Sequence, residues 1–112
     1  MANESEFYKT LSSLEKVTKT NLGKQFENVK GFSESAIHFA NRCDLGLALK
    51  DTIFAEMSAE RLREDASRRY SDGLITADEY FQIHNESLTL VFDGLIDEIK
   101  KAIIPACDCR KA

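Results

Sequence analysis

The sequence predicts an all-α fold, an antiparallel bundle of three long helices over residues 4–29, 34–70 and 76–104. Apolar residues recur at three- and four-residue steps along each range, as the buried side of a helix requires. Residues that favour turns stand between the ranges, and no strand-like alternation competes with the helical pattern. We therefore expect one helical domain over residues 1–112.

Length and composition are typical of a folded single domain. The 112 residues are 43% hydrophobic and 30% charged, with one proline and five glycines. The net charge of -4 argues against a protein that neutralises phosphates, so nucleic acid is not the expected partner. No apolar run approaches the roughly 18 residues of a membrane span, and the N-terminal residues do not resemble a signal peptide. We expect a cytoplasmic protein.

The first helix, over residues 4–29, is expected to be amphipathic. Its apolar side carries Phe7, Leu11, Leu14, Leu22, Phe26 and Val29. At about 100° per residue, the opposite side carries Lys9, Lys16, Lys19, Lys24 and Lys30. These five residues, the lysine face, are a candidate surface for an acidic protein or an anionic membrane, where each lysine contributes on the order of 1 kcal/mol.

The second helix is expected to follow a turn at Gly31, with Ser33 or Ser35 as its cap. Apolar residues at helical spacing along one side are Ala36, Phe39, Ala40, Cys43, Leu47, Phe54 and Met57. Gly46 is the weak point, because a glycine inside a helix costs about 1 kcal/mol relative to alanine. We favour a long or mildly kinked helix over a full break there, which would give a four-helix bundle.

The third helix is expected to begin after Thr76 and to end before Pro105, which lacks a backbone N–H. Its apolar residues cover an arc of about 160°, more than one neighbouring helix hides. A second copy of the chain is therefore expected to cover part of it. The residues expected in the core or in this dimer interface are Phe92, Leu95, Ile96 and Ile99. Residues 105–112 are expected to form a flexible tail.

The stretch between the second and third helices has two interpretations. Its second half resembles the calcium loop of the EF-hand family, with Gly73 at the invariant glycine and Glu79 at the last ligand. The first half departs from that family, because Arg68 and Tyr70 stand where oxygen ligands are needed. We therefore predict a hinge without calcium, in which Gly73 ends one helix and Thr76 with Glu79 caps the next.

Signals for a metal site are isolated. His38 and His84, with Glu34 one turn before His38, are candidates for a metal- or small-ligand site in the bundle. The repeated Glu-x-x-His pairs of carboxylate-bridged bundles are absent from the sequence. We therefore expect no cofactor.

The cysteines do not form a convincing disulfide framework. Cys43, Cys107 and Cys109 are an odd number, and the last two are separated by a single residue. Cys107 and Cys109 alone supply only two of the four ligands that a zinc site requires. We expect reduced thiols.

The sequence predicts a non-enzymatic interaction module, since it lacks the common nucleophile, zinc-protease and phosphate-loop motifs. We expect an adaptor, assembly factor or inhibitor that works by protein contact and forms a homodimer. Two alternatives remain open. One is a module that binds a membrane surface through the lysine face, and the other is a bundle that binds a metal or a small ligand.

Overall fold

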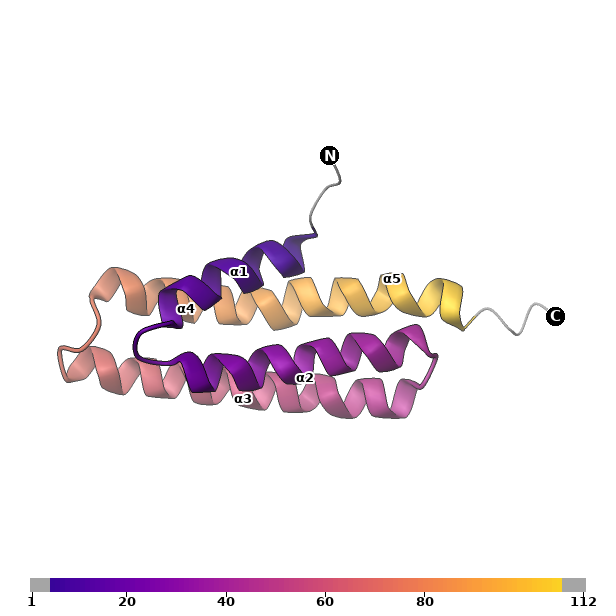
Figure 1. Ribbon diagram of the computed structural model, residues 1–112, viewed down its shortest axis with the longest axis horizontal. Coiled ribbons are helices and arrows are strands. Elements are labelled where there is room, and N and C mark those ends of the chain that lie inside the picture. The colour runs from indigo at the N-terminus through magenta and orange to yellow at the C-terminus, as the bar shows by residue number, and fades with distance from the viewer. Residues whose placement is uncertain (1–4, 108–112) are drawn as a thin grey trace.

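The computed structural model describes residues 5–107, and these form helices that run along one long axis, with α1 tilted against the others (Figure 1). The elements are α1 (Glu6–Thr18), α2 (Gly23–Asn41), α3 (Leu45–Ser71), α4 (Ala77–Thr89), the π-helix η1 (Leu90–Leu95) and α5 (Ile96–Ala106). Because α4, η1 and α5 follow one another without a break, four helical rods pack together. The all-α prediction is confirmed, and the number of helices is corrected from three to four.

The first expected helix is two helices. α1 ends at Thr18, and residues 19–22 form a turn that leads into α2. Leu14 and Leu22 are both buried on either side of this turn. Their spacing keeps the apolar pattern in phase across the break, so periodicity alone predicted one helix over residues 4–29. The turn is marked by Thr20 and Asn21, which have low helix propensity.

Gly31 lies inside α2 and not at a helix end. The buried residues Val29, Ser33 and Ala36 continue in phase on both sides of it. Packing of this side therefore offsets the cost of a helical glycine, about 1 kcal/mol. The prediction of a turn at Gly31, with Ser33 or Ser35 as a cap, is wrong.

The chain reverses at residues 42–44, close to the weak point expected at Gly46. Cys43 adopts a left-handed conformation with φ of 56°, and Asp44 caps α3 by accepting a hydrogen bond from the Leu47 backbone N–H (3.4 Å). Asp is better accommodated at a cap than inside a helix. The favoured long or kinked helix over residues 34–70 is therefore wrong, and the alternative of a four-helix bundle holds.

The expected hinge between α3 and α4 is confirmed. Gly73 has a φ of 75°, and its N–H donates to the Tyr70 carbonyl at 3.1 Å. The Thr76 hydroxyl accepts from the Glu79 backbone N–H (3.1 Å), and the Glu79 carboxylate accepts from the Thr76 N–H (2.8 Å). These two bonds are the predicted capping box. Tyr70 and Tyr80 stack across the hinge with their ring centroids 5.3 Å apart.

The third expected helix forms a single rod that ends later than predicted. Pro105 lies in the last turn of α5, and the Cys107 N–H still donates to the Ile103 carbonyl at 2.9 Å. Proline removes one hydrogen bond, but at the end of a helix few such bonds are left to lose. The prediction that this helix ends before Pro105 is therefore wrong. Of the expected tail, residues 105–107 belong to this end of α5, while residues 108–112 lie outside the described residues.

α1 approaches the rod closely at η1. A Cβ atom on Gly94 would lie 2.8 Å from the Cα atom of Phe7, a distance that real Cβ atoms do not show. Phe7 and Gly94 are both buried, and Phe7 belongs to the main core with the large side chains Leu14, Leu22, Phe26, Leu62, Ile83, Leu90 and Leu95. Only glycine lets the α1 backbone pack at this distance.

We expect Gly94→Ala to lower the free energy of unfolding by about 1–3 kcal/mol, because the added methyl group meets backbone atoms that cannot rotate away. Urea unfolding followed by circular dichroism measures this change. Gly31→Ala is the matched control: no atom lies within 4 Å of the place that its Cβ atom would take, so it should raise stability by up to about 1 kcal/mol. A Gly94→Ala protein as stable as wild type would contradict the close approach.

We expect Gly73→Ala to destabilise the protein by about 1 kcal/mol, because alanine pays a steric penalty at positive φ. Added calcium should leave the melting temperature of the wild-type protein unchanged, since Arg68 and Tyr70 stand in place of ligands. Differential scanning fluorimetry with calcium and with excess chelator measures both effects. A calcium-dependent rise in melting temperature would show that the hinge binds the ion.

Candidate functional site

The bundle is incomplete along half its length. α1 packs on α4, η1 and α2, so it covers the half of the bundle that contains the α3–α4 hinge. In the other half, α2 packs on both α3 and α5 and forms the floor between them. α3 also packs on α4 and η1, but the beginning of α3 and the end of α5 leave a gap.

This gap is an apolar groove of about 290 Å³, which we call the α3–α5 groove. Its lining residues are Leu45, Ala48, Leu49, Thr52, Ile96, Ile99 and Ile103. None of these side chains is charged, and Thr52 satisfies its own hydroxyl by donating to the Ala48 carbonyl at 2.7 Å. The groove therefore offers apolar contacts without an unpaired polar group, which is typical of a docking surface.

The outer edge of α3 continues the apolar surface beyond the groove. Four large side chains follow one another at steps of four residues: Leu45, Leu49, Ile53 and Met57. We call this row the α3 ridge. Leu49 is 62% exposed, and the other three are about half exposed. Residues four apart form one of the ridges by which helices pack against each other, so the α3 ridge has the form of a helix contact that no other helix among residues 5–107 covers.

The buried side of α3 is, in contrast, lined by small residues. Its core residues are Ala48, Ala55, Ala59, Leu62 and Ala66. The apolar side expected from the sequence included Phe54 and Met57, which are exposed at 37% and 51%. That assignment is wrong because α2 packs close to α3, and over the first half of α3 the apolar residues buried in this contact are alanines. The α3 ridge was missed for the same reason, although its four-residue spacing is visible in the sequence.

A polar cluster lies on α3 one turn beyond the last groove residue of that helix and reaches α4. Glu56, one turn after Thr52, forms an ion pair with Arg63 at 2.8 Å. Arg63 also donates to the Ser87 hydroxyl at 3.1 Å, which links α3 to α4. The second carboxylate oxygen of Glu56 is buried and has no hydrogen-bond partner. An apolar partner gains nothing by covering this ion pair, so beyond Thr52 the apolar surface continues only along the α3 ridge.

The α5 side of the groove has a charged rim. A second hollow of about 370 Å³ shares Ile96 with the groove and is lined also by Glu6, Phe92, Asp93, Asp97 and Lys100. Asp97 pairs with Lys101 at 3.1 Å, and this hydrogen bond raises the pKa of the Lys101 ammonium group. On the α3 side, Lys50 is exposed beside the ridge. The α5 edge of the groove therefore carries charges of both signs, and the α3 edge carries a lysine beside the ridge.

The far side of α5 lies near the beginning of α1. Burial raises the pKa of the Tyr8 hydroxyl on α1, and the negative charges of Glu98 on α5 and Glu34 on α2 add to this rise. Glu98 is half-buried, while Tyr8 is partly exposed. α1 thus meets this rod from one side only, and within residues 5–107 no helix covers the groove side.

The structure separates the four residues expected in the core or the interface. Leu95 is fully buried in the main core, whereas Phe92 is 55% exposed at the rim. Ile96 and Ile99 are half-buried and line the groove. Two of the four expected residues therefore line the groove, and Phe92 lies in the neighbouring hollow that shares Ile96 with it.

The lysine face is divided between two helices. Lys9 and Lys16 lie on α1, Lys19 lies in the following turn, and Lys24 and Lys30 lie on α2. Four of them are exposed and Lys30 is half-buried. Because α1 is tilted relative to α2 (Figure 1), the lysines do not form the single stripe that one straight helix would present.

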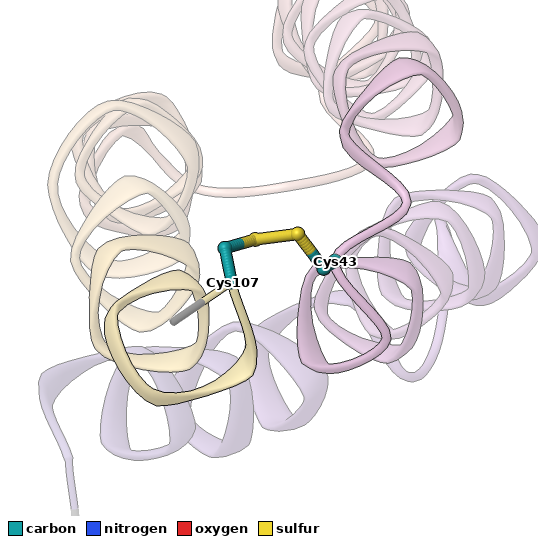
Figure 2. Close-up of a disulfide and its surroundings, with 2 residues drawn as sticks. All are labelled: Cys43 and Cys107. Atoms are coloured by element: carbon teal, nitrogen blue, oxygen red, sulfur yellow. A yellow bond between two sulfur atoms is a disulfide. The ribbon is translucent and has the colours of Figure 1, made fainter. Parts of the chain in front are cut away.

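Cys43 and Cys107 form a disulfide, which corrects the expectation of reduced thiols. Figure 2 shows the bond joining the turn between α2 and α3 to the end of α5. The two Cα atoms lie 5.1 Å apart although the residues are 64 positions apart in the sequence. The spacing of the cysteines in the sequence does not indicate that these two lie close together in the fold. Cys109 lies outside the described residues.

The candidate metal residues do not form a cluster. His38 is exposed on α2, and His84 is half-buried on α4, with its ring 6.2 Å from that of Tyr80. Among residues 5–107, no group of three or more His, Cys, Asp or Glu side chains is placed to hold a metal ion. None of the helices in the described part of the chain has both the length and the hydrophobicity needed to cross a membrane.

Comparison with known proteins gives no relative from which a site could be transferred. No protein-family model, no curated protein and no solved structure matches this chain. The α3–α5 groove is therefore the candidate site on the strength of its own geometry.

We expect the double substitution Cys43→Ser/Cys107→Ser to lower the free energy of unfolding by roughly 2–4 kcal/mol, because the bond closes a long loop and so restricts the unfolded chain. Urea unfolding in a Cys109→Ser background measures the change, and dithiothreitol should lower the stability of the parent but not of the double variant. Mass spectrometry after alkylation without reductant tests the bond itself. Two alkylated cysteines in the native Cys109→Ser protein would contradict it.

Proposed function

We propose that this chain is a non-enzymatic helical interaction module that forms a homodimer through the α3–α5 groove and the α3 ridge. The observation that carries the proposal is an uncharged apolar groove lying beside an exposed row of large apolar side chains. Such surfaces on soluble proteins mark contact sites. An adaptor or assembly factor would use the dimer as a scaffold, and an inhibitor would use it to occupy a partner's surface.

A second copy fits this surface because each copy carries both halves of the contact. The α3 ridge consists of residues four apart, and two such ridges pack into each other's grooves at a crossing angle of about 50°. A twofold axis brings the same patch of both copies together. The ridge of one copy would then lie between the α3 ridge and the Ile96 side of the other.

The apolar area available suits a reversible dimer. The five exposed side chains Leu45, Leu49, Ile53, Met57 and Phe92 are each between 48% and 62% exposed. Together they offer on the order of 500 Å² per copy, or about 1,000 Å² for the pair, which lies at the small end of specific interfaces. We expect a dissociation constant in the micromolar range, about 8 kcal/mol of binding free energy.

The charges at the groove edges favour the same arrangement. Lys50 flanks the α3 ridge, and Asp93 and Asp97 stand on the opposite rim. A ridge that enters the groove of the other copy would bring Lys50 toward these two carboxylates, of which Asp97 also pairs with Lys101 of its own helix. Complementary rim charges contribute mainly to the rate and specificity of association, so salt should weaken the dimer only moderately.

The cytoplasmic location expected from the sequence stays a prediction. The Cys43–Cys107 disulfide weighs against it, because such bonds persist mainly in oxidising compartments. Thiol labelling of the protein in its native cells, before lysis, would decide between the two.

We expect the wild-type protein to be a reversible dimer at tens of micromolar and Leu49→Glu to be a monomer, because a carboxylate placed in the apolar contact loses its water without gaining a partner. Sedimentation equilibrium over a range of concentrations measures both. Circular dichroism of the variant should be unchanged, since Leu49 is exposed in the single copy.

Leu74→Glu is the matched control. Leu74 is also a large exposed side chain, 54% accessible, but it lies in the hinge between α3 and α4. This variant should dimerise as the wild type does. A wild-type protein that stays monomeric at these concentrations, or a Leu49→Glu protein that still dimerises, would rule out the homodimer.

A further inference from the structure

The disulfide lies next to the end of the α3–α5 groove that is lined by the first residue of α3 and the last turn of α5. Leu45, which lines the groove from α3, follows Cys43 by two residues, and Ile103, which lines it from α5, precedes Cys107 by one helical turn. The bond therefore ties the ends of the two groove walls to each other. Figure 2 shows this covalent link crossing the space between the two helix ends.

Few other interactions hold the end of α5. The packing nearest to it is the small cluster of Ala40, Ala48 and Ala102, against which Ile99 and Ile103 rest. The two residues after Ile103 are exposed, the first of them to 74%, and the second is the proline, which supplies no backbone donor. Helix ends with few buried contacts open at low free-energy cost, so the disulfide is the main restraint on the last turn.

The two sulfur-bearing residues are accessible to a reductant. Cys43 and Cys107 are both half-buried, at the end of the bundle and outside the main core. Cys43 sits in a turn with left-handed backbone conformation and not inside a helix. A small dithiol can therefore approach the bond without unfolding of the bundle.

We propose that the Cys43–Cys107 disulfide is a redox latch on the α3–α5 groove, so that the oxidised chain dimerises more tightly than the reduced chain. The inference rests on the proposed function, since it concerns the same groove. In the reaction, a dithiol transfers two electrons and two protons to the bond. Cys43 and Cys107 each become a thiol, and the dithiol becomes a disulfide.

The physical reason is preorganisation of the groove. With the bond intact, Leu45 and Ile103 are held at the spacing that the partner meets. In the reduced chain these side chains and the last turn of α5 have to be ordered during association. Ordering a few such side chains weakens binding by about tenfold. Reduction acts on the end of the groove and leaves the main core in place.

The test uses the full chain with Cys109→Ser, which removes the third thiol and prevents exchange between bonds. Sedimentation equilibrium is run on the oxidised protein, on the same protein in dithiothreitol, and on the added double substitution Cys43→Ser/Cys107→Ser with and without dithiothreitol. We expect the dissociation constant of the dimer to rise about tenfold on reduction. The double variant should bind as the reduced protein does and should not respond to dithiothreitol.

Hydrogen exchange of the reduced protein, measured at a concentration where it is monomeric, separates a local latch from general unfolding. Protection should fall in the last turn of α5 and the first turn of α3, while the amides of Leu62 and Leu90 in the main core stay protected. Loss of protection throughout the chain would overturn the latch, and so would a dissociation constant that changes less than about twofold on reduction.

The two proposals fail in different ways. If the oxidised protein is monomeric, or if Leu49→Glu still dimerises, the homodimer is wrong and the latch falls with it. If the oxidised protein dimerises through Leu49 and reduction leaves the dissociation constant unchanged, only the latch is wrong. If reduction lowers the dissociation constant of the dimer, the intact bond hinders association, and the latch is likewise overturned.

Discussion

The close packing of α2 against α3 is the constraint on which the rest of the structure depends. These helices form the most extensive pair in the bundle and lie side by side (Figure 1). In the half of this pair that borders the groove, the buried apolar residues are all alanines: Ala36 and Ala40 on α2, with Ala48, Ala55 and Ala59 on α3. The distance between packed helices is set by the side chains at the contact. Large residues on α3 are therefore displaced from this side to the surface.

This displacement gives α3 an unusual distribution of hydrophobicity. A helix at the surface of a protein normally turns its large apolar residues inward and its polar residues outward. Over the first half of α3 the buried residues are two alanines and Asp51, while Leu49, Ile53 and Met57 are exposed. Each Å² of apolar surface removed from water contributes about 25 cal/mol, so a partner that covers these three side chains would stabilise the complex. The helix thus has two contact sides, and the chain itself covers one of them.

Several signals that act together within a few residues predicted the structure better than a single residue or a periodic pattern did. The hinge was predictable because Gly73, Thr76 and Glu79 act within a few residues of each other, through a positive φ and a capping box. The turn after α1 was not, because the apolar pattern continues in phase across it. Gly31 was wrongly predicted to end a helix, because its low helix propensity is a property of one residue. Whether the helix continues is decided by the packing of its whole buried side.

The candidate site was only partly predictable for the same reason. Ile96 and Ile99 were expected at an interface because the third helix carries more apolar surface than its neighbours hide. The other wall, with Leu45 and Leu49, depends on which side of α3 faces α2, and periodicity cannot decide between two apolar sides of one helix. Pairing of Cys43 with Cys107 requires the fold itself, since a single sequence gives no distance between residues so far apart.

The two ends of the bundle are held by different kinds of interaction. At the hinge end, noncovalent contacts overlap: the capping box, the left-handed Gly73 and the Tyr70–Tyr80 stack. At the groove end, the α2–α3 turn and the end of α5 share one covalent bond and a small alanine cluster. A change of redox conditions therefore acts on one end only. Because the groove lies at that same end, the apolar surface that the described helices leave uncovered is also the part of the fold whose order depends most on redox conditions.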